Sequence, residues 1–316
     1  MNILFMGTPD FATASLDALV DAGKHVCAVV TQPDKARGRG MKVTFSDVKK
    51  FALEKNLPVL QPETLKNGAF LPTLEEYKPD LIAVVAYGKI LPEYILNFPK
   101  YGCVNVHGSL LPKYRGAAPI QRAVLNGDSV SGVTTMRLDK GMDTGDMYLS
   151  EAVEIGENMT TGELFDALAK IGGKLLVQTV DALENGSAKP LPQDHANATH
   201  ADKIMPEECE LDFSLPARAV HNRIRGLSPF PGAFSHLDGK IVKLYDSRLN
   251  DETGEKAPCG TVLEASRDGV VIACGTGSVR LLSFKPEGKG VLSAADMVNG
   301  RKIAAGMRFE TGKDAQ

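Results

Sequence analysis

Short apolar runs alternate with longer amphipathic segments along the first ~200 residues, and this alternation constrains the fold more than any other feature of the sequence. The runs are rich in Val, Ile and Leu and lack strict polar alternation, which is typical of strands covered on both faces. Such strands are predicted at residues 1–7, 25–32, 81–88, 103–107 and 132–139. Segments with helical spacing lie between them. The order predicts an α/β, Rossmann-like fold with a doubly wound, mostly parallel sheet.

The pattern changes in the last third of the chain. A long helix is predicted over residues 160–184, and after it the sequence becomes rich in Pro, Ala, His, Asn and Thr with little periodicity. A further helix and several short strands follow, with a hairpin turn indicated at Asp238 and Gly239. We therefore predict an N-terminal domain over residues 1–188, a linker over 189–206, and a small OB-like β-barrel domain over 207–316.

The composition excludes several classes of protein. No run approaches the roughly 20 apolar residues that a membrane-spanning helix needs. The five cysteines are scattered, without a CxxC pair or a Cys/His cluster, so we expect a cytoplasmic protein with neither a disulfide framework nor a bound metal. The net charge of −3 does not indicate nucleic-acid binding, so any RNA contact must come from a local cluster of basic residues.

The segment NVHGSLLPKYRG, residues 105–116, leaves the end of a predicted strand, where open α/β sheets place their sites. Asn105 and His107 are two residues apart, so on a strand they share a face. An amide donor and a titratable imidazole then lie side by side. These residue types suit acyl transfer to an amine, which needs donors for an oxyanion and a positioned base for the amine proton.

A second segment, DKGMDTGD at residues 139–146, is a Gly-rich acidic loop after the next predicted strand. Its carboxylates are expected to meet the imidazole from the neighbouring strand end, where one of them can orient the ring and favour its protonated form. Spacing alone leaves alternatives open. A strand-end Asn or His is more often a structural hydrogen-bonding residue, and an acidic loop is more often a turn. Asp139, Asp143 and Asp146 could also hold Ca²⁺ or Mg²⁺, although their spacing is not that of an EF-hand.

The region from Asn105 to Met147 closely resembles the folate-dependent formyltransferases, and among them the branch that acts on methionyl-tRNA. The opening ILFMGTPDFA, the loop QPDKARGRGMK, and the later VVAYGKILP and SPFPGAF share this resemblance, which covers essentially the whole chain. It implies that the catalytic residues are Asn105, His107 and Asp143. Asn105 would donate to the formyl oxygen, and His107 would polarise that oxygen and stabilise the tetrahedral intermediate. Asp143 would orient His107 and accept the amine proton, directly or through a water.

The resemblance also implies the formyl donor, 10-formyltetrahydrofolate. A flat heterocycle with polar edges suits a pocket of main-chain donors and acceptors set in apolar walls. The residues implied for this pocket are Ser109, Leu110, Leu111, Pro112, Ala86, Tyr87, Gly88 and Asp139.

The acceptor is the remaining question, because the same three residues serve several substrates in this family. Enzymes acting on glycinamide ribonucleotide are expected to end after one domain, whereas sugar-nucleotide formyltransferases have a similar second domain and remain an alternative. A non-catalytic RNA-binding module built on the barrel is a second alternative. The segment DKARGRGMK, residues 34–42, favours initiator Met-tRNA, since cationic side chains on a loop suit a phosphate backbone. The tRNA-binding residues expected there are Lys35, Arg37, Arg39 and Lys42. The default expectation for the oligomeric state is a monomer.

Overall fold

The computed structural model describes residues 1–37, 42–254 and 257–310. The chain forms two compact units, each assembled from more than one stretch of sequence. Unit 1 consists of Met1–Pro119, Ser131–Val153 and Phe165–Ala201. Unit 2 consists of Ile120–Val130, Glu154–Leu164 and Asp202–Gln316.

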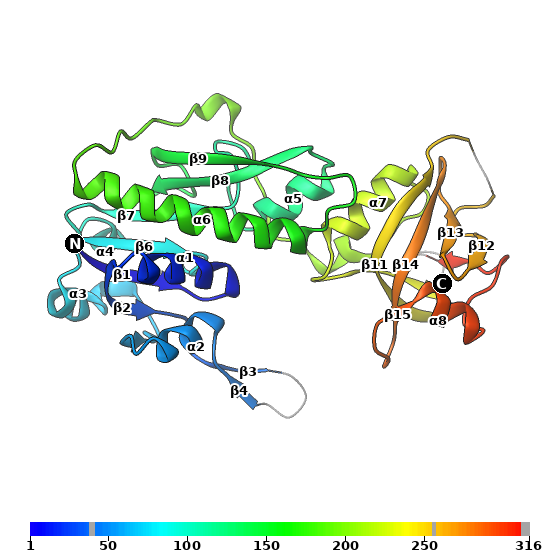
Figure 1. The fold of residues 1–316 in the computed structure, drawn as a ribbon, viewed down its shortest axis with the longest axis horizontal. Helices are drawn as coiled ribbons and strands as arrows, with labels where there is room; N and C mark the ends of the chain where they lie inside the picture. The colour runs from blue at the N-terminus through cyan, green and yellow to red at the C-terminus, as the bar shows by residue number, and fades with distance from the viewer. Residues whose placement is uncertain (38–41, 255–256, 311–316) are drawn as a thin grey trace. The chain divides into compact units, whose positions relative to one another are not determined.

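Unit 1 is built on a seven-stranded sheet with the order β5-β2-β1-β6-β7-β8-β9 (Figure 1). The strands are β1 (Asn2–Gly7), β2 (His25–Val30), β5 (Val59–Leu60), β6 (Leu81–Val85), β7 (Cys103–His107), β8 (Val130–Arg137) and β9 (Met147–Glu154). From β5 to β7 all neighbours pair in parallel, and β8 runs antiparallel to β7. The expected α/β fold with a mostly parallel sheet is confirmed.

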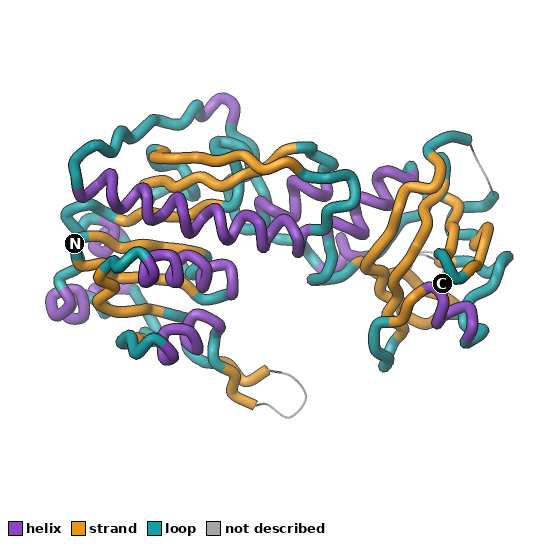
Figure 2. Tube along the Cα trace, in the orientation of Figure 1, coloured by secondary structure: helices purple, strands orange, loops and turns teal. Residues whose placement is uncertain are grey.

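Helices cover both faces of this sheet (Figure 2). The unit contains α1 (Asp10–Asp21), α2 (Asp47–Glu54), η1 (Lys66–Gly68), α3 (Leu71–Tyr77), α4 (Glu93–Leu96), η2 (His195–Asn197) and most of α6 (Thr161–Glu184). Gly173 of α6 lies so close to α1 that a Cβ there would be 2.8 Å from the Ala14 carbonyl oxygen. The opposite face packs Leu74 of α3 and Ile95 of α4 into one apolar cluster with strand residues. Because the strands are covered on both faces, they are apolar throughout.

A hairpin follows the carboxyl end of β2. Strands β3 (Lys35–Arg37) and β4 (Lys42–Thr44) pair antiparallel, with Arg37 opposite Lys42. At the base of the hairpin, Asp34 forms an ion pair with Lys49 and accepts a 2.9 Å hydrogen bond from Gln61 Nε2. The base is therefore attached to the body of unit 1.

Unit 2 contains a curled antiparallel sheet with the order β12-β13-β14-β11-β10-β16, and β15 pairs with β14. Its strands are β10 (Ala233–Leu237), β11 (Lys240–Asp251), β12 (Val262–Ser266), β13 (Gly269–Ala273), β14 (Ser278–Pro286), β15 (Leu292–Ser293) and β16 (Phe309–Glu310). Its helices are α5 (Pro119–Leu125), which starts at the last residue of a unit 1 segment, η3 (Pro206–Cys209), α7 (Ala217–Gly226) and α8 (Ala294–Asn299). A single apolar cluster joins α7, α8 and the sheet. The prediction of a small OB-like domain is confirmed.

Two features of unit 1 differ from what the sequence pattern indicated. Strand β9 and helix α3 were not predicted, because their short, partly exposed segments lack a clear apolar period. Within the expected linker, Leu191 exchanges 2.8 and 2.9 Å main-chain hydrogen bonds with Met147, and Ala201 donates a 2.7 Å bond to Arg115. Residues 189–201 therefore belong to unit 1, held by hydrogen bonds that leave no periodic signal. No helix in the described part of the chain is long and apolar enough to cross a membrane.

Candidate active site

Strand β7 presents Cys103, Asn105 and His107 on one face of the sheet, because alternate residues of a strand point the same way. Cys103 belongs to the apolar cluster beneath α3 and α4, which identifies the face. Asn105 is half-buried, and His107, at the carboxyl end of the strand, is 5% exposed. The predicted pairing of an amide and an imidazole on one face is therefore present.

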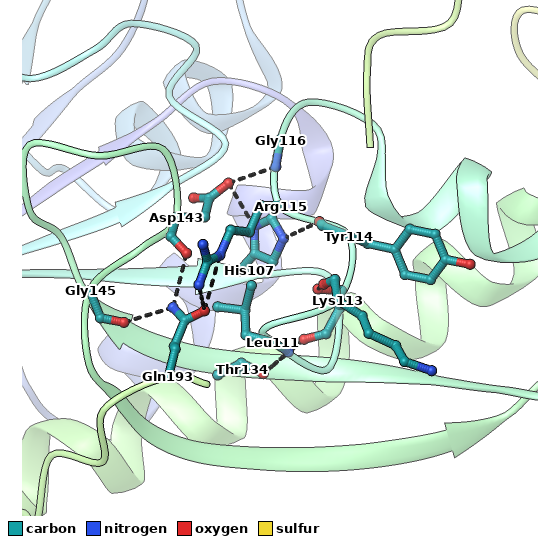
Figure 3. A network of polar contacts seen from close by, with 11 residues as sticks. His107, Leu111, Lys113, Tyr114, Arg115, Gly116, Thr134, Asp143, Gly145 and Gln193 are labelled. Atoms are coloured by element: carbon teal, nitrogen blue, oxygen red, sulfur yellow. Dashed lines mark hydrogen bonds and ion pairs between the residues drawn. The ribbon is translucent and has the colours of Figure 1, made fainter. Parts of the chain in front are cut away.

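Two oxygen atoms face the two nitrogens of the His107 ring (Figure 3). Nε2 lies 2.8 Å from the main-chain oxygen of Tyr114. A carbonyl oxygen only accepts, so Nε2 carries a hydrogen. Nδ1 lies 3.6 Å from Oδ2 of Asp143. Asp143 thus faces the nitrogen that gains a proton when the ring becomes positively charged.

Asp143 reaches His107 by a different route from the one that the strand order predicted. Because β8 is antiparallel to β7, Arg137 at its carboxyl end lies opposite Val104, near the start of β7. Leu138 then donates a 2.8 Å hydrogen bond to the Cys103 carbonyl. The loop of residues 138–146 must therefore fold back along β7 to bring Asp143 to the ring, and the two segments do not leave adjacent strand ends.

The Asp143 carboxylate and backbone are both constrained. Its Oδ2 accepts a 2.9 Å hydrogen bond from the Gly116 amide, in addition to facing His107. Its φ of 54° lies in the left-handed region, which Asp tolerates better than most side chains but which still costs free energy. A conformation of this kind persists only where surrounding contacts hold it.

The segment Ser109–Pro112, expected to line a folate pocket, is fixed by hydrogen bonds to Thr134 of β8. Thr134 Oγ1 donates to the Ser109 carbonyl at 2.8 Å and accepts from the Leu111 amide at 3.2 Å. Ser109 Oγ in turn donates to the Lys113 carbonyl at 2.6 Å. Thr134 had no predicted role, and nothing in its sequence context distinguishes it from an ordinary strand threonine.

The loop after β6 contains the other expected pocket residues. Ala86 and Gly88 have φ values of 45° and 82°, and both are exposed, so their main-chain groups are accessible to a flat ligand. Between them, the Tyr87 carbonyl accepts hydrogen bonds from Thr8 Oγ1 and Gln32 Nε2 at 3.2 and 3.0 Å. The Tyr87 ring is in the core, where burial raises its pKa to about 12. Tyr87 therefore anchors a loop whose neighbouring residues remain available.

Asp139 stabilises its own loop. Its Oδ1 accepts hydrogen bonds from the Gly141 amide at 3.0 Å and from Thr144 Oγ1 at 2.7 Å. A Ca²⁺ or Mg²⁺ site in the acidic loop would need several oxygen ligands grouped together. Across residues 1–37, 42–254 and 257–310, no three His, Cys, Asp or Glu side chains are grouped as metal ligands would be.

Two further residues were not predicted: Gln193, which contacts the 138–146 loop, and Arg115, which contacts Gln193. Arg115 is 5% exposed and donates to Gln193 Oε1 from Nε at 3.1 Å and from Nη2 at 2.7 Å. Gln193 Nε2 donates to the carbonyl oxygens of Asp143 and Gly145 at 2.9 and 2.7 Å. Arg115 lies within the segment that carries the family resemblance, so the sequence offered a reason to consider it as a site residue. Gln193 lies in a stretch without periodicity, and the sequence offered no such reason.

The basic hairpin can be placed only in part. Lys35, Arg37 and Lys42 lie on β3 and β4, in the connection after β2. That connection leaves the same edge of the sheet as the loops after β6 and β7, since these strands are parallel. Arg39 lies outside the described residues.

Comparison with known proteins identifies the family of the chain. The sequence model of the family described as "Formyl transferase" matches residues 1–180, and that described as "Formyl transferase, C-terminal domain" matches residues 203–302. The methionyl-tRNA formyltransferase of Acetivibrio thermocellus is 45% identical over 306 residues, covering 97% of this chain and 98% of the relative. That of Caldanaerobacter subterraneus is 47% identical over 307 residues, covering 97% of this chain and 99% of the relative.

Solved structures agree on the fold at much lower identity. WlaRD, a sugar 3N-formyl transferase crystallised with dTDP and 5-N-formyl-THF, has a TM-score of 0.65 and 21% identity, covering 92% of this chain and 99% of that one. HypX of Aquifex aeolicus, in complex with tetrahydrofolic acid, has a TM-score of 0.63 and 19% identity, covering 94% of this chain and 46% of that one. With both sequence models and the full-length relatives in agreement, the chain belongs to the formyl transferase family, among the methionyl-tRNA formyltransferases.

Proposed function

We propose that the protein transfers a formyl group from 10-formyltetrahydrofolate to the α-amino group of methionine on initiator Met-tRNA, in the cytoplasm and as a monomer. The product, formylmethionyl-tRNA, serves translation initiation. The observation that carries the proposal is the placement of His107 beside Asp143, at 3.6 Å, on the strand face that also presents Asn105. Relatives named methionyl-tRNA formyltransferase that match nearly the whole chain support the choice of acceptor.

Asn105 and His107 act on the formyl oxygen. When the amine attacks the formyl carbon, that oxygen becomes an oxyanion, and donors already in place stabilise it without reorganising. The Asn105 amide supplies one donor. His107 supplies a positive charge beside it when the ring is protonated. Its Nε2 donates a 2.8 Å hydrogen bond to the Tyr114 carbonyl, which fixes the orientation of the ring.

Asp143 has two proposed tasks. Facing Nδ1 of His107, its carboxylate stabilises the charged ring that opposes the oxyanion. It also accepts the proton that the attacking amine loses, directly or through a water. When the bond between the formyl carbon and N10 then breaks, N10 keeps the electron pair and takes up one proton. The side chain is 14% exposed, so it remains accessible to an incoming amine.

The residues present fit a folate donor. Exposed main chain at Ala86 and Gly88, and the loop at Ser109–Pro112 held by Thr134, offer the fixed polar groups that a pterin ring requires. The donor supplies the activated formyl group. The chain supplies its orientation, through these loops and through Asp139, which stabilises the loop leading to Asp143.

The acceptor is proposed to bind through the hairpin and the C-terminal domain. Lys35, Arg37, Arg39 and Lys42 are assigned to the tRNA, with Arg39 in the groove at the end of the acceptor stem and the others on phosphates. In this assignment residues 1–188 are the catalytic domain and residues 207–316 the tRNA-binding domain. Arg39→Ala should then lower kcat/KM for initiator Met-tRNA much more than Lys35→Ala does.

A sugar-nucleotide amine is the alternative acceptor, because the solved structures of similar fold include sugar formyltransferases. Their identity to this chain is 21% and 18%, which bears on the fold alone. The deciding experiment offers 10-formyltetrahydrofolate with initiator Met-tRNA, free methionine and a nucleotide-linked aminosugar as competing acceptors. Formyl transfer to Met-tRNA alone is the expected result. Transfer to the sugar instead, or to no acceptor, would overturn the proposal.

A further inference from the structure

We propose that Gln193 is a positioning residue that holds Asp143 against His107, and that Arg115 sets the orientation of the Gln193 amide. The inference rests on the proposed function, because it takes Asp143 to be catalytic. It adds two residues that neither the sequence pattern nor the family resemblance assigns to the reaction. Both are buried to 5% exposure, so neither is an ordinary surface side chain.

The first step is the position of the Gln193 amide. Its Nε2 lies 2.9 Å from the Asp143 carbonyl oxygen and 2.7 Å from that of Gly145 (Figure 3). One NH₂ group thus uses both hydrogens on two main-chain oxygens of the same loop. Because Asp143 has a φ of 54°, its carbonyl would be oriented differently in ordinary backbone. The hydrogen bond from Gln193 therefore stabilises the uncommon backbone conformation at Asp143.

The second step is what that conformation does to the carboxylate. The direction of a side chain is set by its own backbone, so holding the main chain at Asp143 also holds its Cα–Cβ bond. The carboxylate then lies where Oδ2 faces both the Gly116 amide, at 2.9 Å, and His107 Nδ1, at 3.6 Å. Displacing a reacting group by as little as about 1 Å can cost on the order of 100-fold in rate.

The third step is the role of Arg115. A glutamine amide can be rotated to exchange its oxygen and nitrogen, and only its partners decide which is which. Arg115 donates twice to one end, from Nε and Nη2, and a guanidinium cannot accept. That end must therefore be the oxygen, so the NH₂ group faces the two carbonyls. Arg115 fixes the amide in the orientation that the loop needs.

Arg115 is held in turn by main chain and side chain around it. Its amide donates to the Thr199 carbonyl at 2.8 Å, and its carbonyl accepts from Ala201 at 2.7 Å. Its Nη2 also lies 3.0 Å from His195 Nδ1.

The 138–146 loop has a second anchor besides Gln193. At Gly145, a Cβ would lie 1.9 Å from the Arg137 carbonyl oxygen, so only glycine permits this approach. The Gln193 contact is therefore part of a fixed arrangement.

The test removes the two N–H donors of the Gln193 amide while keeping the shape of its side chain. Gln193→Glu is isosteric and keeps acceptors for Arg115, so the ion pair supports folding, but it presents oxygen to both loop carbonyls. We expect kcat for Met-tRNA formylation to fall roughly 10- to 100-fold, as for other residues that orient a catalytic group. KM for either substrate and tetrahydrofolate binding should stay within about twofold. Gln178→Glu, the same change on the exposed side of α6, is the control and should behave as wild type.

A double-substitution series separates positioning from a general structural effect. If Gln193 acts through Asp143, then Gln193→Glu should have almost no further effect on kcat in an Asp143→Asn background. An equal fall in both backgrounds would overturn the inference, as would wild-type turnover by Gln193→Glu. If Asp143→Asn itself keeps full turnover, the proposed role of Asp143 fails instead. Arg115→Lys, which cannot make the paired contact, should show a smaller loss of the same kind and provides a second variant.

Discussion

Each unit of the molecule contains a buried arginine bound to a side-chain amide, and the two differ in where their contacts lead. Arg225 of α7 donates to Asn222 Oδ1 at 2.9 Å and to the Met159 carbonyl at 3.1 Å, so its contacts end on main chain within unit 2. Arg115 in unit 1 donates to Gln193, whose amide reaches the Asp143 carbonyl. Both arginines are 5% exposed. Burial and hydrogen bonding alone do not identify a residue that supports catalysis. What distinguishes Arg115 is that its contacts lead to a partly accessible carboxylate.

The largest effects on turnover are expected in unit 1, at Asp143 and the two residues proposed to act with it. Asn105→Ala, His107→Ala and Asp143→Ala should each lower kcat on the order of 100-fold or more, as for loss of an oxyanion donor or a general base. Affinity for donor and tRNA should change far less. Single-turnover formylation with a parallel binding titration measures both. A variant that keeps near wild-type turnover removes its residue from the mechanism.

The next largest effect is expected on stability, at Arg225 in unit 2. Arg225→Met should lower the free energy of unfolding by about 1–3 kcal/mol, because it leaves the Met159 carbonyl and the Asn222 amide without a buried partner. Burial, and then the neighbouring Arg218, lower the pKa of Arg225, so the folded protein disfavours its charge and the expected loss comes from the hydrogen bonds. Turnover per folded molecule should stay near wild type in urea-unfolding and activity measurements. Loss of turnover at unchanged stability would show that the two arginines do not differ as argued.

A smaller effect is expected at Thr134, where unit 1 fixes the pocket loop. Thr134→Val keeps the side-chain shape but removes the contacts to the Ser109 carbonyl and the Leu111 amide. We expect KM for the folate donor to rise several-fold, corresponding to about 1 kcal/mol of lost hydrogen bonding, with kcat nearly unchanged. Thr253→Val, an exposed threonine of unit 2, is the matched control. A fall in kcat with constant KM would assign Thr134 to the catalytic step.

The smallest effect concerns pH and His221, which lies beside Arg225 in α7. Its ring nitrogens contact Ser247 Oγ at 2.8 Å and the Glu157 carbonyl at 3.0 Å. Burial first, and then Arg225 and Arg248, lower its pKa in the folded protein. The unfolded chain therefore binds the proton more readily, so stability should fall as pH drops through the ordinary histidine range and below. In unfolding curves from pH 7.5 to 5, His221→Gln should lose less stability than wild type. An equal loss would exclude His221 as the cause.

Most of unit 1 was predictable because its signals are local. Buried strands such as β6 are continuous apolar runs, and the spacing of Asn105 and His107 places them on one face wherever a strand forms. The direction of β8 was not predictable, since an apolar strand carries no mark of its neighbour's orientation. Nor was Gln193, because a single polar residue 50 positions from Asp143 has no pattern to reveal its contact. Contacts between distant polar residues are decided by packing, which the sequence does not display.

The position of Gln193 late in the chain has a consequence for synthesis on the ribosome. Asn105, His107 and Asp143 have all been added by the end of the 138–146 loop, but the amide that holds this loop is added 50 residues after Asp143. At ~5–20 residues per second, a growing chain spends about 3–10 s with the three groups that are proposed to react and without that support. During synthesis, the proposed reacting groups are therefore present before the residue that positions Asp143.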